Sequence, residues 1–350
     1  MADTEKFMFA SDYQEGAHPN IMKRLMETNM VSTDGYGVDG FCASAKDRIR
    51  KACGCPEAEV EFLVGGTQTT ATVIDALLKP YQGVISADCG HINVHEAGAI
   101  EFGGHKVLSL PAEFGKLSAK QVGDCLEAYA SDGNRDHMVM PGMVYLSQPT
   151  EYGTLYSLEE LKQIHNICRY YRVPLYVDGA RLSYALASPE NDVTLEDLAS
   201  LADVFYIGGT KCGALFGEAV VIPDPGLIPH FFTIIKQHGA LLAKGRLLGI
   251  QFDELFRDDL YFHIGDSADR FALKIQDALK NAGIPLLFES PTNQVFFICP
   301  DEKIEEISKA AEYAFMEKYD ERHTVLRFAT SWATTEEKVD KLCEALQELS

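Results

Sequence analysis

The chain has 350 residues, 46% of them hydrophobic, and this length predicts a large domain with a smaller second domain. Acidic side chains number 52 and basic ones 31, so the formal net charge is −21, which argues against a nucleic-acid or anionic-membrane partner. No basic segment followed by an apolar stretch opens the chain, and no apolar run approaches the roughly 20 residues that span a bilayer.

The cysteines of this chain are typical of a protein in a reducing compartment. The nine cysteines are scattered without a Cys-x-x-Cys pair, so we expect reduced thiols and no disulfide framework. Together with the missing leader, this pattern predicts a soluble cytoplasmic protein.

The first 56 residues show weak periodicity and many turn residues, including the Asp-Gly-Tyr-Gly run at 34–37. Such a segment has little capacity to pack on itself. We therefore expect residues 1–56 to form an arm that lies on a partner subunit.

A large domain is predicted for residues 57–240. Up to about residue 223, short apolar runs alternate with segments of helical period such as 157–171, which is typical of a parallel sheet with crossover helices. The candidate strands are Val60–Val64, Val84–Ala87, Lys106–Leu110, Met138–Ser147, Leu175–Val177, Val204–Ile207 and Ala219–Ile222.

The pattern changes after the Pro-Asp-Pro-Gly turn at 223–226. Residues 227–282 look almost wholly helical, with breaks at Gly239 and Gly245, and residues 283–350 suggest the order strand, strand, helix, strand, helix. We place a small α+β domain at 241–350.

Two predicted strand ends carry reactive side chains. Lys211 follows the apolar run 204–207, and Asp178-Gly179-Ala180-Arg181 follows the run 175–177. A lysine and an aspartate in one crevice are what pyridoxal phosphate (PLP) needs, because the amine holds the aldehyde as a Schiff base and the carboxylate keeps the pyridine nitrogen protonated. A lysine between glycines is otherwise a solvated surface group, but a carboxylate at a buried strand end is costly without a partner.

Other residues fit the same cofactor. Gly65, Gly66 and Thr67 form a turn between a strand and a helix, where free amides can bind the phosphate, although such a turn is also a routine connection. His91 follows the strand at 84–87, where its ring can stack on the cofactor and take part in proton transfer.

A metal site is not expected near His91, His95 and Glu96, because the His-Glu-x-x-His order is absent and no third ligand suggests itself. The alternative for His95 is a histidine hydrogen-bonded within a helix.

A substrate carboxylate is best held by a bidentate arginine, and Arg181 and Arg327 are the candidates. Arg327 lies in an apolar run, where its alternative role is a buried ion pair with an acidic neighbour.

Taken together, these residues resemble the threonine aldolase and aromatic amino acid β-eliminating lyase family of PLP enzymes, over nearly the whole chain. The resemblance implies an α/β large domain of the aspartate aminotransferase type (fold type I) with a mainly parallel sheet, plus a small C-terminal α+β domain. It also implies that Lys211 carries the cofactor, with Asp178, Arg181, His91 and the turn at 65–67 around it.

The resemblance extends to the arm and the C-terminal region. Ser11 is similar to a serine that helps hold the substrate carboxylate, as Arg327 does. Tyr36 resembles a loop residue that reaches the neighbouring subunit's site, and Arg246 one that approaches a cofactor phosphate across the dimer. One element departs from the family, since Glu151 stands where many members have a histidine, and Glu151 could replace it as the proton acceptor.

The implied activity is that of a low-specificity L-threonine aldolase, which cleaves L-threonine or L-allo-threonine to glycine and an aldehyde. A homodimer or homotetramer is implied as well. The alternatives are another PLP reaction on the same scaffold, such as β-elimination or transamination, and a non-catalytic PLP-fold protein.

Overall fold

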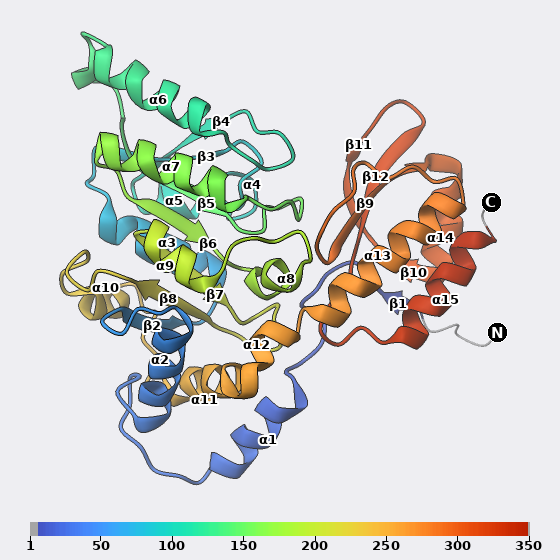
Figure 1. Ribbon diagram of the computed structural model, residues 1–350, viewed down its shortest axis with the longest axis horizontal. Coiled ribbons are helices and arrows are strands. Elements are labelled where there is room, and N and C mark those ends of the chain that lie inside the picture. Colours follow the sequence, from blue (N-terminus) through green and yellow to red (C-terminus); the bar gives the residue numbers. More distant parts are fainter. Residues whose placement is uncertain (1–5, 349–350) are drawn as a thin grey trace.

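A seven-stranded sheet forms the centre of the larger part of the molecule in the computed structural model, which describes residues 6–348 (Figure 1). Its strand order is β2-β8-β7-β6-β5-β3-β4, with parallel pairing from β7 to β4 and antiparallel pairing of β8 with both neighbours. The strands are β2 (Glu59–Leu63), β3 (Gln82–Ala87), β4 (Lys106–Leu110), β5 (Met140–Ser147), β6 (Leu175–Asp178), β7 (Val204–Gly208) and β8 (Glu218–Ile222). Every strand predicted for the large domain is present, and the mainly parallel α/β sheet is confirmed.

Side chains alternate between the two faces of this sheet. In β5, Val144 and Leu146 join one hydrophobic core, whereas Met143 and Tyr145 join another. Both faces are therefore buried under helices, as a parallel sheet requires. The helices of this part are α3 (Gly66–Leu77), α4 (His91–Val94), α5 (Ala99–Phe102), α6 (Ala119–Ser131), α7 (Leu158–Tyr171), α8 (Leu182–Ala187), α9 (Leu195–Leu201) and α10 (Phe231–Gln237), with a 3-10 turn at Arg135–His137.

Residues 6–56 contain more regular structure than their weak periodicity suggests. Two helices, α1 (Pro19–Thr28) and α2 (Gly40–Ala52), begin at good N-terminal signals, because Pro19 opens the first and the carboxylate of Asp39 caps the second. The strand β1 (Phe7–Met8) lies in the small domain, where it pairs with β10 (Ala311–Glu312). The N-terminal segment thus spans both parts of the molecule.

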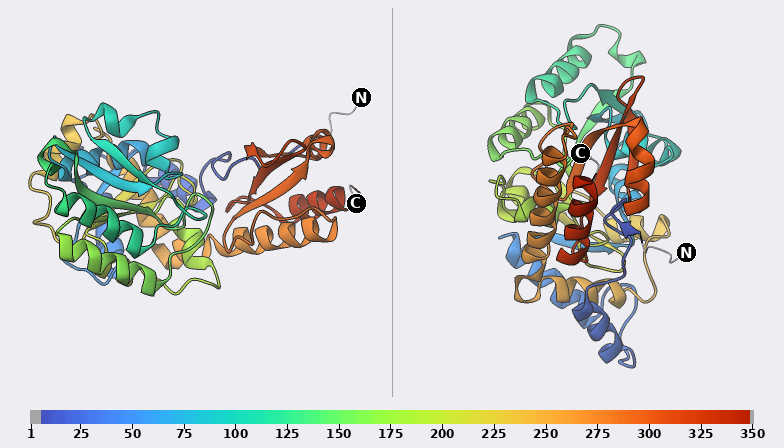
Figure 2. Two further views of the ribbon diagram at one scale, coloured as in Figure 1. Left: turned by 90° about the horizontal axis from the view of Figure 1, so that it is seen from above. Right: turned by 90° about the vertical axis from the view of Figure 1, so that its right-hand side faces the viewer.

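The small domain holds an antiparallel sheet in the order β11-β12-β9, covered by α13 and α15 (Figure 2). Its elements are α13 (Asp266–Asn281), β9 (Gln294–Pro300), α14 (Ile304–Ala310), β10, β11 (Ala314–Lys318), β12 (His323–Ala329) and α15 (Glu336–Gln347), with a 3-10 turn at Asp301–Lys303. The predicted order of elements over 283–350 is wrong. The segment before β9 contains two prolines and forms only an isolated bridge from Leu286 to Phe297, so the first predicted strand is missing.

Along the chain, the large sheet is followed by α11 (Arg246–Leu255), a 3-10 turn at Arg257–Asp259 and α12 (Leu260–His263), which come before α13. Phe252 and Tyr261 belong to the same core as Phe205 of the large sheet, whereas Phe271 and Leu279 of α13 belong to the core of the small domain. We therefore infer that the chain passes from one core to the other within α13, later than the boundary at 240–241 that we predicted.

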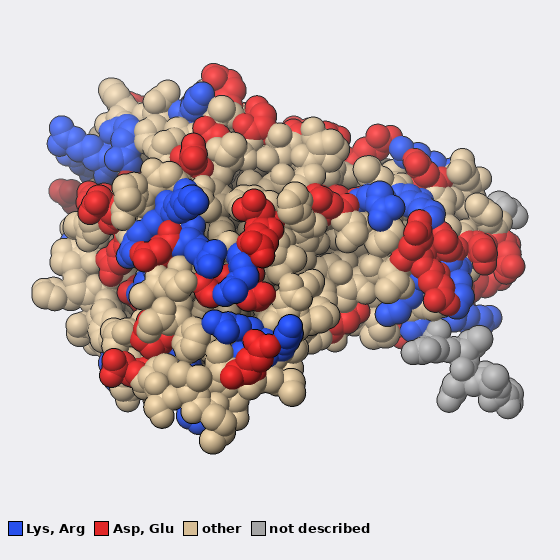
Figure 3. All heavy atoms as spheres, turned by 60° about the horizontal axis from the view of Figure 1, so that its bottom comes forward, with Lys and Arg blue, Asp and Glu red and all other residues tan. Residues whose placement is uncertain are grey.

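The surface is charged without a single dominant sign on the face in Figure 3, where acidic and basic side chains are intermixed. Within residues 6–348, no helix combines the length and apolar character needed to cross a membrane.

Helices α2 and α11 cross at a close backbone contact, and this contact yields a stability prediction. A methyl group on Gly249 would lie 2.6 Å from the amide nitrogen of Cys42, whereas one on Gly123 of α6 would meet only Ile167, at 3.6 Å. We expect Gly249→Ala to lower the free energy of unfolding by about 1–3 kcal/mol through overpacking. Gly123→Ala should raise it by about 0.5–1 kcal/mol through helix propensity. Urea unfolding of both variants measures the difference, and equal effects would contradict the packing argument.

Candidate active site

The carboxyl ends of six strands, β2 to β7, meet at a pair of adjoining cavities. The smaller cavity, of about 310 Å³, collects eight of the predicted site residues: Gly65, Gly66, Thr67, His91, Glu151, Asp178, Arg181 and Lys211. The larger, of about 940 Å³, shares His91, Glu151, Arg181 and Lys211 with the first and adds Arg327 of the small domain. The predicted convergence of strand ends therefore exists, at the position where open α/β sheets bind ligands.

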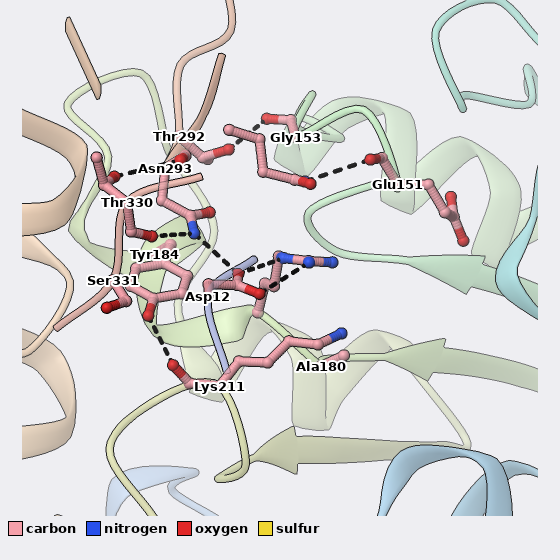
Figure 4. Close-up of polar contacts among 12 residues, drawn as sticks. Asp12, Glu151, Gly153, Ala180, Tyr184, Lys211, Thr292, Asn293, Thr330 and Ser331 are labelled. Atoms are coloured by element: carbon pink, nitrogen blue, oxygen red, sulfur yellow. Dashed lines mark hydrogen bonds and ion pairs between the residues drawn. The ribbon is translucent and has the colours of Figure 1, made fainter. Parts of the chain in front are cut away.

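Lys211 has a free amine in this site. Its carbonyl oxygen accepts a hydrogen bond of 2.6 Å from the hydroxyl of Tyr184 (Figure 4). In residues 6–348, by contrast, no side chain forms a hydrogen bond or ion pair with its Nζ. Burial, with the positive charge of Arg181 second, lowers the pKa of Lys211 from its usual value. A neutral amine is the form that attacks an aldehyde.

Asp178 ends β6 with its carboxylate held in place. Its Oδ1 accepts a hydrogen bond of 2.9 Å from the amide of Ala180, and its Oδ2 accepts one of 2.5 Å from the hydroxyl of Tyr145. The carboxylate is buried, yet it lines the smaller cavity. It is thus a fixed hydrogen-bond acceptor for a ligand in that cavity.

The N-terminus of α3 faces the same cavity. Gly65 is the N-cap residue and has no side chain to cap the helix, while Gly66 and Thr67 line the cavity beside it. Amides of a first helical turn without a side-chain cap bind anions such as phosphate.

Arg181 forms a buried, two-pronged ion pair with Asp12, a residue for which the sequence pattern predicts no role. The guanidinium Nε and Nη2 lie 2.6 and 3.0 Å from the two carboxylate oxygens of Asp12, and Asn293 of the small domain donates a further bond of 2.9 Å (Figure 4). Burial alone would raise the pKa of Asp12, but the charges of Arg181 and Lys211 and these hydrogen bonds lower it to about 2. The sequence signal available for Asp12 was its position directly after Ser11, but the family resemblance assigns the role at this place to Ser11.

Ser11 itself lines neither cavity, and its hydroxyl oxygen is buried without a hydrogen-bond partner among the described residues. Arg327 donates to the side-chain oxygen of Gln294 and to the carbonyl oxygen of Ala10, each at 2.9 Å. Its Nε has no partner, and no carboxylate in residues 6–348 pairs with it. Burial, followed by the charge of Arg181, lowers the pKa of Arg327 to about 10. The alternative role of Arg327, a buried ion pair with an acidic neighbour, is therefore not observed in residues 6–348.

His91 is oriented by two carboxylates. Its amide donates to Oε1 of Glu151 at 2.7 Å, and its ring Nδ1 lies 2.9 Å from Oε1 of Glu96. Glu151 also accepts a bond of 2.8 Å from the hydroxyl of Ser147, and burial raises its pKa.

Glu218 is a buried carboxyl that lines the smaller cavity. Like Asp12, it was not predicted from the sequence. It accepts hydrogen bonds from the hydroxyl of Thr210, at 2.8 Å, and the amide of Gly209, at 3.0 Å, and so fixes the turn that carries Lys211. Burial raises the pKa of Glu218 to about 7, against the opposing effects of Thr210 and Lys211. The only signal was an acidic residue at the start of the apolar run 219–222.

Tyr36 and Arg246 lie away from both cavities of this chain. The Tyr36 ring packs against the amine of Lys236, 4.3 Å from its centroid, and Arg246 donates to the carbonyl oxygens of Asn29 and Val31. Their roles across a subunit boundary stay predictions. Within the described ranges, no cluster of three or more His, Cys, Asp or Glu side chains has the geometry of a metal site.

The chain is similar to known proteins over nearly its whole length. The family model described as β-eliminating lyase matches residues 9–336. A low-specificity L-threonine aldolase from Pseudomonas aeruginosa is 31% identical over 97% of this chain and 96% of its own length. The solved structure of a Leishmania major threonine aldolase is 41% identical, covers 98% of this chain and 99% of its own, and superposes with a TM-score of 0.95. An aspartate aminotransferase from Thermus thermophilus, 14% identical over 97% of this chain and 90% of its own, has a TM-score of 0.71 and shares the fold.

The pair of Asp12 with Arg181 gives a prediction about stability and pH. The pKa of Asp12 falls from 3.8 to about 2 on folding. The stabilisation is therefore complete above pH 4, and about 2 kcal/mol of it is lost as the pH falls from 4 to 2. We expect Asp12→Asn to cost about 3–5 kcal/mol at pH 7, because it leaves a buried cation unpaired, and to remove this part of the acid dependence.

Urea unfolding at several pH values measures both effects. Asp301→Asn is the control, because it breaks an exposed pair with Lys318 at 2.5 Å and should lower stability much less than Asp12→Asn. Unchanged stability in Asp12→Asn would show that the buried pair contributes nothing.

Proposed function

Because this chain belongs to the β-eliminating lyase family, we propose that it is a PLP-dependent low-specificity L-threonine aldolase. It cleaves L-threonine, L-allo-threonine and related β-hydroxy-α-amino acids to glycine and an aldehyde. The observation that carries the proposal is the buried, unpaired amine of Lys211, which shares one cavity with the fixed carboxylate of Asp178.

The residues of the smaller cavity fit PLP in their chemistry. Lys211 would hold the aldehyde carbon, Asp178 the protonated pyridine nitrogen, and the amides at Gly66 and Thr67 the phosphate. His91 would lie against the ring, with its imidazole fixed by Glu96. When bound, PLP supplies an electron-accepting ring that stabilises negative charge at the substrate Cα.

The protein's own part in the reaction begins with the substrate carboxylate. Arg327 is a planar cation that lines the larger cavity and has no carboxylate partner among residues 6–348. We propose that Arg327, with the positive field of Arg181, binds the carboxylate and so directs the rest of the amino acid into the larger cavity. Glu151 is proposed to contact the substrate from the wall that the two cavities share.

We also propose a homodimer, or a tetramer built from two dimers, in which Tyr36 and Arg246 contribute to the neighbouring subunit's site. Three methionines on or next to α1 support this proposal, since Met22, Met26 and Met30 are 40%, 75% and 90% exposed. A reducing compartment such as the cytoplasm suits the nine free cysteines.

The first test measures glycine and aldehyde released from a panel of β-hydroxy-α-amino acids by the protein with PLP. Pyruvate with ammonia, or a keto acid, as the product would instead indicate β-elimination or transamination.

Lys211→Ala should lower turnover by on the order of 10³-fold or more, because it removes the group that exchanges with the substrate amine. Borohydride reduction followed by peptide mapping should label Lys211. Lys23→Ala, an exposed lysine, is the control, and a label on any other lysine would rule out the assignment.

Arg327→Lys tests the carboxylate contact. Lysine keeps the charge but loses the planar fork, so we expect KM for threonine to rise roughly 10–100-fold, the loss of one charged hydrogen bond. The visible spectrum of the bound cofactor should not change. Arg270→Lys, on the exposed side of α13, should leave KM unaltered. An unchanged KM in Arg327→Lys would assign Arg327 a structural role alone.

A further inference from the structure

His95 has an unexpected position at the end of the short helix α4. Its backbone amide bonds the carbonyl oxygen of His91, but its side chain is exposed to the larger cavity. No hydrogen bond reaches either ring nitrogen from residues 6–348. The expectation of a histidine hydrogen-bonded within a helix is therefore not met, and the ring is free to bind a ligand.

The other candidates for a proton acceptor are each tied to neighbouring groups through one atom. The ring Nδ1 of His91 is held by Glu96, and Oε1 of Glu151 accepts two hydrogen bonds, from the amide of His91 and the hydroxyl of Ser147, whereas both ring nitrogens of His95 lack a partner among residues 6–348. Asp88 and Glu317 also line the larger cavity, but both residues are exposed to solvent.

The location of His95 matches the part of the substrate that reacts. Arg327 and His95 line the larger cavity but not the smaller, whereas Lys211 and His91 line both. An amino acid whose carboxylate is bound at Arg327 and whose amine is at Lys211 therefore has its side chain in the cavity that His95 faces. The His95 and His91 rings are tilted against each other with 5.6 Å between centroids, so His95 lies at the edge of the group proposed to cover the cofactor.

Burial and the positive charges around the cavity favour the neutral form of this imidazole. Burial is the largest cause of its lowered pKa, followed by the charges of His91 on α4, Arg327 on β12, and Lys211 and Arg181 at the strand ends. The carboxylates of Asp88, Glu151 and Glu317 in the same cavity act in the opposite sense but do not reverse the shift. A neutral ring at pH 7 has a lone pair that can accept a proton.

We propose that His95 is the catalytic base that accepts the β-hydroxyl proton of the substrate. This inference rests on the proposed aldolase function. The O–H bond breaks as its proton passes to a ring nitrogen of His95, and the oxygen electron pair forms the second C–O bond of the aldehyde. The Cα–Cβ bond breaks with its electrons left at Cα, and Cα is later protonated to give glycine. His95 then returns its proton to water in the open cavity.

The experiment separates cleavage at Cβ from chemistry at Cα. His95→Gln is assayed for cleavage of L-threonine, and separately for exchange of the glycine α-proton in deuterated water by NMR, a reaction without a β-hydroxyl. We expect cleavage to fall by about 10²–10³-fold while exchange is retained. The acid limb of the kcat/KM profile should vanish in this variant. In the wild type this limb should lie below the ordinary histidine pKa of 6.5, because the neutral ring is the active form.

Two further variants serve as controls for His95→Gln. Val94→Ala lies on the same helix and lines the same cavity, so it should retain the acid limb. Glu151→Gln keeps an oxygen that can accept from the amide of His91, so it should change exchange and cleavage in equal proportion.

Three outcomes would overturn the inference: undiminished cleavage by His95→Gln, an equal loss of exchange and cleavage in that variant, or a selective loss of cleavage in Glu151→Gln. Failure of the proposed function is distinct, because the wild type itself would then release no glycine from any β-hydroxy-α-amino acid.

Discussion

The ion pair between Arg181 and Asp12 is the contact on which the rest of the site depends. Asp12 lies between β1, which belongs to the small domain, and α1, which packs against α11 beside the large sheet. Arg181 follows β6 of the large sheet, and Asn293 of the small domain binds the same carboxylate. One buried carboxylate thus connects three segments that are remote in sequence. A buried pair of this kind is costly to break, so it fixes how the two domains meet.

The same pair determines the charge balance of the cavities. Asp12 neutralises Arg181, but it does not bond to Lys211 or Arg327, which have no carboxylate partner in the described part of the chain. Arg327, a cation without a paired anion beside the amine of Lys211, makes a site that favours an anionic ligand. Phosphate and carboxylate groups supply that charge, which is why the site suits a phosphorylated cofactor together with an amino acid.

The arrangement of strands explains why the reactive groups meet. Parallel strands end at one edge of the sheet, so Asp178 after β6 and His91 after β3 face the same space. The antiparallel pairing of β7 with β8 has a separate effect. The turn between them brings Glu218 back beside Thr210, so a single carboxylate fixes the loop that presents Lys211. The division into a smaller and a larger cavity follows, since Arg327 and His95 enter only the larger.

The strands of the large sheet and the meeting of Lys211 and Asp178 at one cavity could be predicted from the sequence, because both depend on a short-range pattern: an apolar run followed by a polar residue at its end. The family could be predicted from the order of the motifs along the chain. The helices of the N-terminal segment and the order of the C-terminal strands were not predictable, since the first have weak periodicity and the second depends on where two prolines interrupt pairing. The partner of Arg181, the role of Glu218 and the free ring of His95 are contacts between residues far apart in the chain or oriented by a cavity. Only the tertiary structure decides such contacts, because burial and the distance between side chains are properties of packing and leave no periodic signal in the sequence.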